Sequence, residues 1–476
     1  MDPSPGATPY SAPAGCPMSR QQTSLYGPEF AADPHHVYDA FRAHGPAAPI
    51  ELAPGVDATL IVQHEAALRV LQNPALFARD SRRWAALREG AIPMDSPVLP
   101  MMMYRPNCLF TDGAEHLRLR KAVTESLARL NSSRLSRDVE RIADYLIDQF
   151  IERGTADLLN EYAKLLPLLL FNQLFGCPGD IGDRLTRSMS AIFDGEDVLR
   201  ANAELTECLM ELVTLKRRQP GDDITSWLIQ HPAGLRDEEL KDQLVMLMGA
   251  GVEPERNLIA NALLLMLAGD QPGGHDRRGG GHERRGSGML VEDALDDVLW
   301  NNPPIANYAT HYPVRDIELD GVVLKAETPV LISFAAANSD PSLTDARQTL
   351  SKGAHLAWGA GPHVCPAKSP ATLIALTAIE KILNTVPDLS LAVPASGVGW
   401  RPGPFHRALI ALPVRFTPTA ARRTATGAQP PAATSAQLPD PYRNAAPQSP
   451  PAGRHAAEPA KKNKGWWSSF LDVFRV

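Results

Sequence analysis

The sequence predicts a mainly α-helical protein with small β-sheets, folded as one large helical domain. Long stretches carry apolar residues at the 3.6-residue spacing of a helix with one buried face, whereas strand-like stretches are short. Both ends of the chain are rich in proline and poor in large apolar side chains. A domain of about 390 residues exceeds the usual size of a single core, so we expect a large ligand to organise its centre.

Each predicted element rests on its own pattern of apolar residues. The stretches with helical spacing are 134–153, 158–174, 237–267 and 370–386. The strand-like stretches are 59–62, 317–324, 329–334 and 408–414. Helices therefore dominate, and the strands are expected to form only a few small hairpins.

The distribution of the 43 prolines divides the chain into four parts. Residues 1–28 form a flexible leader of proline, serine and glycine, and residues 29–416 alternate apolar runs with short breakers, as a packed domain does. Residues 417–460 contain almost no large apolar side chains, so they are predicted to be a disordered linker. Residues 461–476 are a separate segment.

The segment 461–476 has the spacing of an amphipathic helix and begins with three lysines. At the end of a flexible tether, such a helix is typical of an anchor for a partner groove or for a membrane surface. The alternative is a helix that packs against its own domain. The apolar residues of the segment are Trp466, Trp467, Phe470, Leu471 and Phe474.

The composition argues against several classes of protein. Lysine and arginine together number 47 against 54 acidic residues, a net charge of −7, which argues against a nucleic-acid partner. The longest apolar stretches fall short of the roughly 20 residues of a membrane span, and no signal-peptide pattern opens the chain. The five cysteines are scattered and form no C-x-x-C pair, so a reducing, cytoplasmic location is expected.

Cys365 has the surroundings of a reactive or metal-binding thiolate. Gly359 and Gly361 permit a tight backbone turn just before it, and a helical pattern begins shortly after it. The N-terminus of a helix lowers the pKa of a nearby thiol, which favours a thiolate that can act as a nucleophile or a soft metal ligand. A buried core cysteine is the alternative, but the glycines and Trp358 favour the ligand.

The stretch W-G-A-G-P-H-V-C-P-A at 358–367 resembles the cysteine loop F-G-x-G-x-H-x-C-x-G of the cytochrome P-450 superfamily. The resemblance implies the cytochrome P-450 fold around haem b, with Cys365 as the ligand of the haem iron. It also implies that His363 lies beside a haem propionate and that Trp358 packs on the proximal face, with Gly359 and Gly361 shaping the loop.

Two further motifs extend the resemblance over about residues 30–416. His116 and Arg120 resemble the family's H-x-x-x-R, whose spacing of four places both side chains on one helical face, where they would bind the propionates. Residues 336–341 resemble its A-x-N-x-D-P. The end of the domain, from Arg401 to Phe416, is similar to that of many bacterial members.

The central helix departs from the family pattern A-G-x-[D/E]-T. Ala250, Gly251 and Glu253 match it, but Pro254 replaces the threonine that normally orients water and protons. Proline offers neither hydroxyl nor N–H and is expected to kink the helix. Protons would then come from Glu253, water or a substrate hydroxyl, with Ala250 and Gly251 opening a groove over the iron. A packing kink without mechanistic effect is the alternative.

The family's E-x-x-R motif is also altered in this chain: Asp297 stands in place of the glutamate and Trp300 in place of the arginine. We hypothesise that Asp297 pairs with Arg347, while Trp300 packs in apolar surroundings. The strand position that often holds a propionate-binding arginine falls at about His311. A small actinobacterial subgroup of the superfamily shares the tryptophan, and some of its relatives are encoded beside small GTPases, which implies a signalling context.

Residues 93–111 lie where the family places its mobile substrate loop. With the methionines of the central helix, this loop predicts an apolar pocket for a small hydrophobic substrate, although its methionines could equally be part of the core. The residues in question are Met101, Met102, Met103, Tyr104, Met246 and Met248.

Two functions follow from the resemblance. The first is a haem-thiolate monooxygenase that inserts one oxygen atom from O2 into its substrate, with electrons from an external ferredoxin and ferredoxin reductase. The second is a catalytically relaxed haem-binding protein that acts as a sensor or recruits partners into a signalling complex. A serine hydrolase or NTPase is disfavoured, because no G-x-S-x-G or phosphate-loop pattern occurs.

Overall fold

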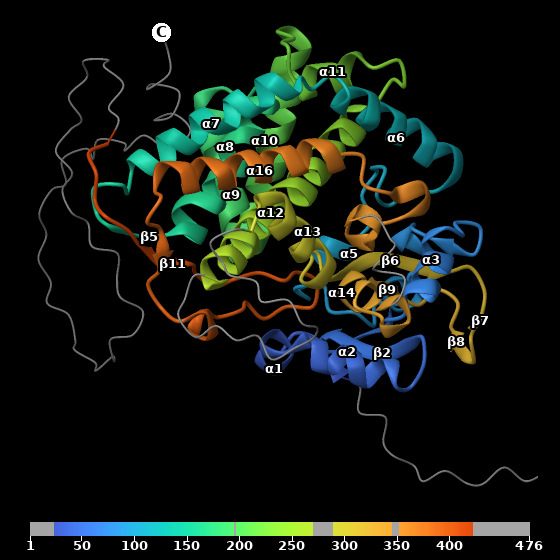
Figure 1. Cartoon of the computed structure of the whole chain (residues 1–476). Helices are drawn as coiled ribbons and strands as arrows, with labels where there is room; N and C mark the ends of the chain where they lie inside the picture. The colour runs from blue at the N-terminus through green and yellow to red at the C-terminus, as the bar shows by residue number, and fades with distance from the viewer. Residues whose placement is uncertain (1–22, 195–196, 270–288, 345–351, 422–476) are drawn as a thin grey trace, which may run out of the picture.

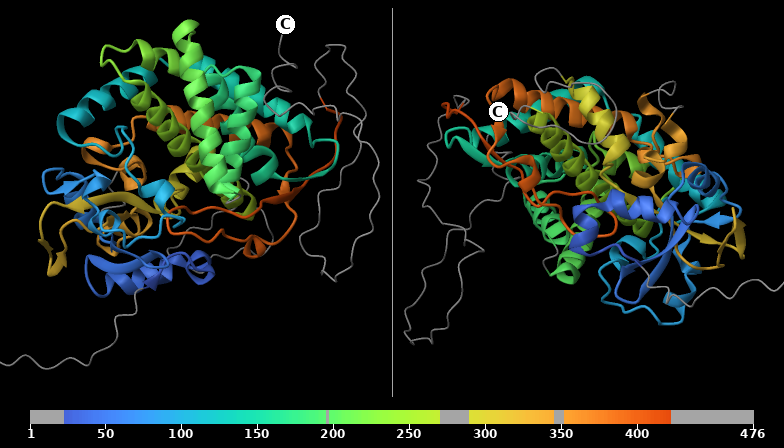
Figure 2. Two further views of the ribbon diagram at one scale, coloured as in Figure 1. Left: turned by 180° about the vertical axis from the view of Figure 1, so that it is seen from behind. Right: turned by 60° about the horizontal axis from the view of Figure 1, so that its bottom comes forward.

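The structure, a computed structural model, describes residues 23–194, 197–269, 289–344 and 352–421. A large group of helices makes up one side of the molecule, and a mixed β-sheet with shorter helices makes up the other (Figure 1). Figure 2 shows the same division from behind and from below. The prediction of a mainly helical fold with small sheets is therefore confirmed.

The predicted long helices are present. The stretch 134–153 begins in α7, which ends at Asp148, and 370–386 lies in α16 up to Thr385, whereas 158–174 is divided into a π-helical turn and α8. The helices are α1 (Pro28–Ala32), α2 (Pro34–Arg42), α3 (His64–Leu71), α4 (Ala85–Arg88), α5 (Leu99–Met102), α6 (Gly113–Leu127), α7 (Ser132–Asp148), α8 (Leu165–Leu174), α9 (Gly179–Asp194), α10 (Val198–Arg218), α11 (Ile224–Gln230), α12 (Asp237–Gly269), α13 (Val291–Asn301), α14 (Phe334–Asn338) and α16 (Lys368–Thr385).

The sheet is larger than the sequence predicts. Six strands lie in the order β1-β2-β3-β9-β6-β4, and β10-β11-β5 and β7-β8 form two smaller sheets. The strands are β1 (Thr23–Ser24), β2 (Ala47–Ala53), β3 (Val56–Ile61), β4 (Phe77–Ala78), β5 (Thr155–Asp157), β6 (Asn307–Pro313), β7 (Ile317–Leu319), β8 (Val322–Leu324), β9 (Val330–Ser333), β10 (Ser390–Leu391) and β11 (Pro413–Arg415).

Two of the predicted strands differ in detail. The stretch 317–324 is a β7–β8 hairpin, because Asp320 and Gly321 both have positive φ and form its turn. The stretch 408–414 contributes only β11. The packed part also begins before residue 29, since β1 pairs with β2 and Leu25 is fully buried.

Strand β6 carries an irregularity that bears on the site. Tyr308 pairs with Ile332 and His311 with Val330, so β6 has one more residue than β9 over this interval. Ala309, within it, has a φ of 50°. Such a bulge re-aims the side chains that follow it. It precedes His311, which is buried.

Helix α12 passes through the centre of the helical part and packs against α8, α10, α13 and α16 (Figure 1). It continues through Pro254 as a single helix of 33 residues. The expected kink therefore does not end the helix. No helix in the described ranges is long and apolar enough to cross a membrane.

The N-terminus of α12 is tied to α6 by an ion pair. The buried carboxylate of Glu239 accepts a hydrogen bond from Arg118 Nη2 at 2.6 Å and another from the backbone N–H of Arg236 at 2.9 Å. Burial alone would raise the pKa of Glu239, but these bonds outweigh it and lower the pKa to about 2. The ionised carboxylate thus caps α12 and fixes α6, the helix that carries His116 and Arg120.

We predict that Glu239→Gln destabilises the protein at neutral pH and that the difference shrinks in acid. Because the folded-state pKa lies below the ordinary 4.5, the stabilisation is complete above pH 4.5 and is lost as the pH falls toward 2. Urea unfolding of the wild type and of Glu239→Gln at pH 7, 4.5 and 3 measures this difference in the free energy of unfolding. Exposed Glu238→Gln is the control, and a difference that did not change with pH would contradict the assignment.

Candidate functional site

The loop that carries Cys365 is bent by two glycines in the left-handed region. Gly359 has a φ of 72° and Gly361 a φ of 69°. A Cβ on Gly361 would collide with the carbonyl oxygen of Leu71 at the end of α3, so only glycine fits there. The Cys365 N–H donates to the Trp358 carbonyl oxygen at 2.7 Å and closes the loop. The predicted tight turn is present.

The thiol of Cys365 does not behave as the sequence predicts. Helix α16 begins at Lys368, three residues after it. Burial is the largest influence and raises the pKa of Cys365, while the Ala367 backbone N–H and the charge of Arg120 lower it by less. The start of the helix lowers the pKa, as predicted, but burial outweighs it, so the predicted net lowering is wrong. A metal cation deprotonates a coordinating thiol, so a metal partner would favour the thiolate here.

Helix α6 brings two predicted residues to this loop. The rings of His116 and His363 lie 4.0 Å apart between centroids at 34°, and Arg120 Nη2 donates to the carbonyl oxygen of Val364. As the spacing of four predicts, both α6 side chains face the cysteine loop. Arg118, between them, points toward α12 instead.

Two imidazole nitrogens beside the loop form no hydrogen bond with the residues that the structure describes. They are His116 Nε2 and, from β6, His311 Nδ1, and both are buried. Burial, followed by the charges of Arg120 and Arg79, lowers the pKa of His116 to about 4, and the pKa of His363 and His311 falls well below its ordinary value. The histidines are thus neutral at pH 7, and the positive charge comes from the two arginines.

These residues fit a haem. The thiolate of Cys365 would suit iron as a ligand. The two carboxylates of a haem would suit the unpaired imidazole nitrogens and the guanidinium groups of Arg120 and Arg79. Among the ion pairs of the described residues, His363 pairs with Asp112, and its Nε2 lies 3.9 Å from Asp112 Oδ1. The sequence motifs indicated His116, Arg120 and His363 but gave no sign of Arg79.

The cysteine loop is fastened to α13 through neutral contacts. Asn338 of α14 is fully buried; its Nδ2 donates to the Leu299 carbonyl at 3.0 Å, and its Oδ1 accepts from the Leu356 N–H at 2.7 Å. The ring of Trp300 meets His355 edge-on, with 5.7 Å between centroids. The sequence identified Trp300 as packed and 336–341 as a family motif, but it did not indicate that Asn338 bridges α13 and the loop.

The hypothesised pair of Asp297 and Arg347 is not tested, because Arg347 lies outside the described residues. Asp297 Oδ1 accepts a hydrogen bond from Asn301 Nδ2 at 3.0 Å. The segment 461–476, with its anchor prediction, lies outside the described residues as well.

On the central helix α12, Gly251 and Glu253 make different kinds of contact. A Cβ on Gly251 would collide with the ring of Phe171 on α8, so the ring lies directly against the backbone of α12 at this glycine. Glu253 is buried; its carboxylate accepts from Arg256 Nη1 at 3.2 Å and from Arg401 Nη2. Burial opposes ionisation, but the charges of Arg401 and Arg256 lower the pKa of Glu253 below its ordinary value. Glu253 is therefore ionised.

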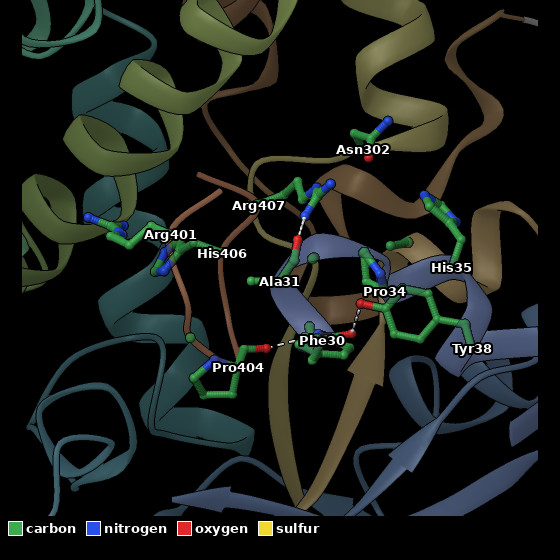
Figure 3. Close-up of a pocket in the computed structure, with 14 residues that line it drawn as sticks. Phe30, Ala31, Pro34, His35, Tyr38, Asn302, Arg401, Pro404, His406 and Arg407 are labelled. Atoms are coloured by element: carbon green, nitrogen blue, oxygen red, sulfur yellow. Dashed lines mark hydrogen bonds between the residues drawn. The ribbon is translucent and has the colours of Figure 1, made fainter. Parts of the chain in front are cut away.

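Arg401 connects Glu253 with a polar pocket. This pocket lies between the first two helices and the segment 401–407, and Figure 3 shows Arg401, His406 and Arg407 along one wall and Tyr38 opposite. Arg407 donates to the carbonyl oxygen of Ala31 across it. No residue of the cysteine loop lines this pocket, so it is not the apolar substrate site that the sequence predicts.

The side chains that were predicted to line an apolar pocket lie in different environments. Met102 is fully buried in the core beside the sheet, whereas Met103 is partly exposed. Met246 lies 3.6 Å from the Cys108 sulfur, and Met248 is fully buried in the core of α9–α12. Tyr104 stacks under Arg82 at 4.1 Å. At least two of these methionines are thus core residues.

The fold and this loop together define the class of thiolate-ligated haem proteins, and comparison with known proteins agrees. No family profile matches the chain. It is 31% identical to cytochrome P450 monooxygenase PikC of Streptomyces venezuelae, over 82% of this chain and 92% of that protein. It is 30% identical to nocardicin C N-oxygenase of Nocardia uniformis subsp. tsuyamanensis, over 84% of this chain and 100% of that protein.

A solved structure gives the same result. CYP154C4 from Streptomyces sp. W2061 superimposes with a TM-score of 0.71 at 27% identity, covering 83% of this chain and 97% of that one. The chain belongs to the cytochrome P450 monooxygenases, oxidoreductases whose cofactor is haem. The predicted fold, enzyme class and cofactor are confirmed.

We predict that Asn338→Ala loosens the cysteine loop. The change leaves the Leu299 carbonyl and the Leu356 N–H buried without partners, which costs about 1–3 kcal/mol for each group left unpaired. We expect a lower thermal midpoint and faster loss of haem to an apomyoglobin acceptor. Asn73→Ala, which removes an exposed bond to the Arg69 carbonyl, is the control; equal behaviour of the two variants would refute the clamp.

Proposed function

We propose that this chain is a haem-thiolate monooxygenase that inserts one oxygen atom from O2 into a small hydrophobic substrate. In this proposal Cys365 ligates the haem iron, and His116, His363 and Arg120 bind the haem carboxylates. Trp358, Gly359 and Gly361 shape the loop below the porphyrin. The observation that carries the proposal is the closed, glycine-bent loop that presents Cys365 beside orphaned imidazole nitrogens.

Bound haem supplies the O2 and one-electron chemistry, and the electrons come from an external ferredoxin and its reductase. The chain itself must deliver protons. Pro254 has neither a hydroxyl nor an N–H, so the ordinary donor at that position of α12 is absent. Glu253, which precedes it, is ionised and hydrogen-bonded to Arg401, a wall residue of the polar pocket.

We infer that Glu253 accepts protons from the side of this pocket and passes them toward the substrate face of α12, with Ala250 and Gly251 beside it. Arg401 and Arg256 keep the carboxylate ionised between transfers. Their charges also make Glu253 a weak base, so proton transfer depends on water that reaches it from the pocket.

Turnover of a panel of small hydrophobic compounds tests the proposal. With NADPH, ferredoxin and ferredoxin reductase, the wild-type protein should give a hydroxylated, epoxidised or N-oxygenated product. Glu253→Gln should lower product formation at least about ten-fold, in the range of a positioned acid–base group, and divert reducing equivalents to peroxide.

The control for Glu253→Gln is Glu238→Gln, an exposed change on the same helix. Haem content and substrate affinity should stay close to wild type in Glu253→Gln, which separates a proton-delivery defect from a folding defect. If Glu253→Gln and Glu238→Gln formed the same amount of product per NADPH consumed, the proposed role of Glu253 would be refuted. A normal haem spectrum without product from any substrate or from peroxide would favour the sensor function.

A further inference from the structure

The polar pocket between α1, α2 and the segment 401–407 has a cationic lining, with no carboxylate among the lining residues that the structure describes (Figure 3). Arg401, His406 and Arg407 come from the segment 401–407, and His35 comes from α2. Burial lowers the pKa of His406 to about 4 and that of His35 below its ordinary value. Both imidazoles are therefore neutral at pH 7, and the positive charge comes from the two arginines.

Arg407 reaches this pocket with neutral partners. Its Nη1 donates to the Ala31 carbonyl oxygen, and its guanidinium carbon lies 3.5 Å from the centre of the Trp400 ring. Its Nε is buried and forms no hydrogen bond with any described residue. Within the described ranges, no carboxylate forms an ion pair with this guanidinium. Burial is the largest influence on Arg407 and lowers its pKa to about 10.

The carboxylate that acts on Arg407, that of Asp33, lies outside the pocket lining. Asp33 is exposed, and its carboxylate accepts a hydrogen bond from the His36 backbone N–H at the start of α2, at 3.2 Å. Water screens an exposed carboxylate, so it offsets little of the cost of burying the guanidinium. Proteins normally pair a buried charge. Arg407 therefore carries a charge that the described residues leave largely unbalanced.

Arg401 differs from Arg407, because its charge is balanced by Glu253. Its Nη2 donates to the Glu253 carboxylate, which also accepts from Arg256 Nη1 at 3.2 Å. Glu253 is not itself a lining residue of the pocket. Two guanidiniums thus line one pocket, and only one of them has a buried carboxylate as partner.

The size of the pocket limits what could bind there. Its volume is about 20 Å³, and a water molecule needs roughly 10–15 Å³ measured in this way. The pocket therefore suits an occupant of one or a few heavy atoms. A small anion would accept hydrogen bonds from guanidinium N–H groups and would also supply the missing negative charge, whereas water would supply none.

We propose that this pocket binds a small monovalent anion, of the size of chloride or formate, on the guanidiniums of Arg407 and Arg401. The site itself does not depend on the proposed function. Its consequence does: because Glu253 is proposed to receive protons through water from this pocket, a bound anion would regulate that proton transfer.

Thermal unfolding of the full-length, haem-loaded protein tests the site. The midpoint is measured at pH 7 and constant ionic strength while sodium gluconate, whose anion is too large for the pocket, is replaced by sodium chloride or formate. A ligand that binds only the folded state raises the midpoint with its concentration. Chloride and formate should do so, and Arg407→Gln should weaken their apparent affinity about ten-fold, as expected for loss of a charged hydrogen-bond donor. Arg407→Lys, which keeps the charge, should retain part of the affinity.

Glu253→Gln should have the opposite effect. Removal of the carboxylate leaves the charge of Arg401 to the pocket, so the affinity for chloride should rise about five-fold, at the low end of typical couplings between sites. A folding defect does not produce tighter binding. Arg415→Gln, which changes an exposed arginine on β11, is the matched control and should keep the wild-type affinity.

Equal midpoints of the wild type in chloride, formate and gluconate would mean that the pocket holds only water, and the inference would be overturned. An Arg407→Gln variant with the wild-type response would overturn it as well. Unchanged affinity in Glu253→Gln would contradict the part assigned to Arg401. None of these outcomes alters the haem spectrum or product formation, so they are distinct from a failure of the proposed function.

Discussion

The half-buried thiol of Cys365 is the constraint to which the other features of the site respond. In the protein alone, desolvation raises the pKa of this thiol and opposes the thiolate. A cation at the sulfur would make ionisation favourable there, and in the proposed site haem iron would be that cation. The surroundings suit a large anionic cofactor: beside the loop lie neutral histidines whose nitrogens have no hydrogen bond, and arginines that form no ion pair, among the described residues. In the proposed site, haem binding and thiolate formation would therefore be coupled.

The loop is held in place by shape, by the neutral hydrogen bonds of Asn338 and by the bond from Arg120 to the Val364 carbonyl. Gly361 lets the backbone approach the end of α3, and Asn338 joins the loop to α13. Trp300 and His355 add an aromatic contact between the same two elements. A neutral clamp avoids the desolvation cost of a buried ion pair.

The sequence predicts the helical part of the fold well, because the periodicity of a long amphipathic stretch indicates which of its faces is buried. It underestimates the sheet, since β2 contains a proline and β3 pairs with β9, which lies far away in the sequence. Motif spacing places His116 and Arg120 on the correct face. Arg79 is missed because nothing local distinguishes a buried arginine from an exposed one. The pKa of Cys365 is predicted in the wrong direction, because burial is a tertiary property.

The central claim is that Cys365 is the anionic ligand of a haem iron, and one spectrum tests it most directly. The full-length protein is reconstituted with haem, reduced with dithionite and exposed to carbon monoxide. The account predicts the red-shifted Soret band of a thiolate-ligated ferrous carbonyl, and its loss in Cys365→Ala while protein yield is retained. A wild-type band at the position typical of histidine ligation, or an unchanged band in Cys365→Ala, would contradict it.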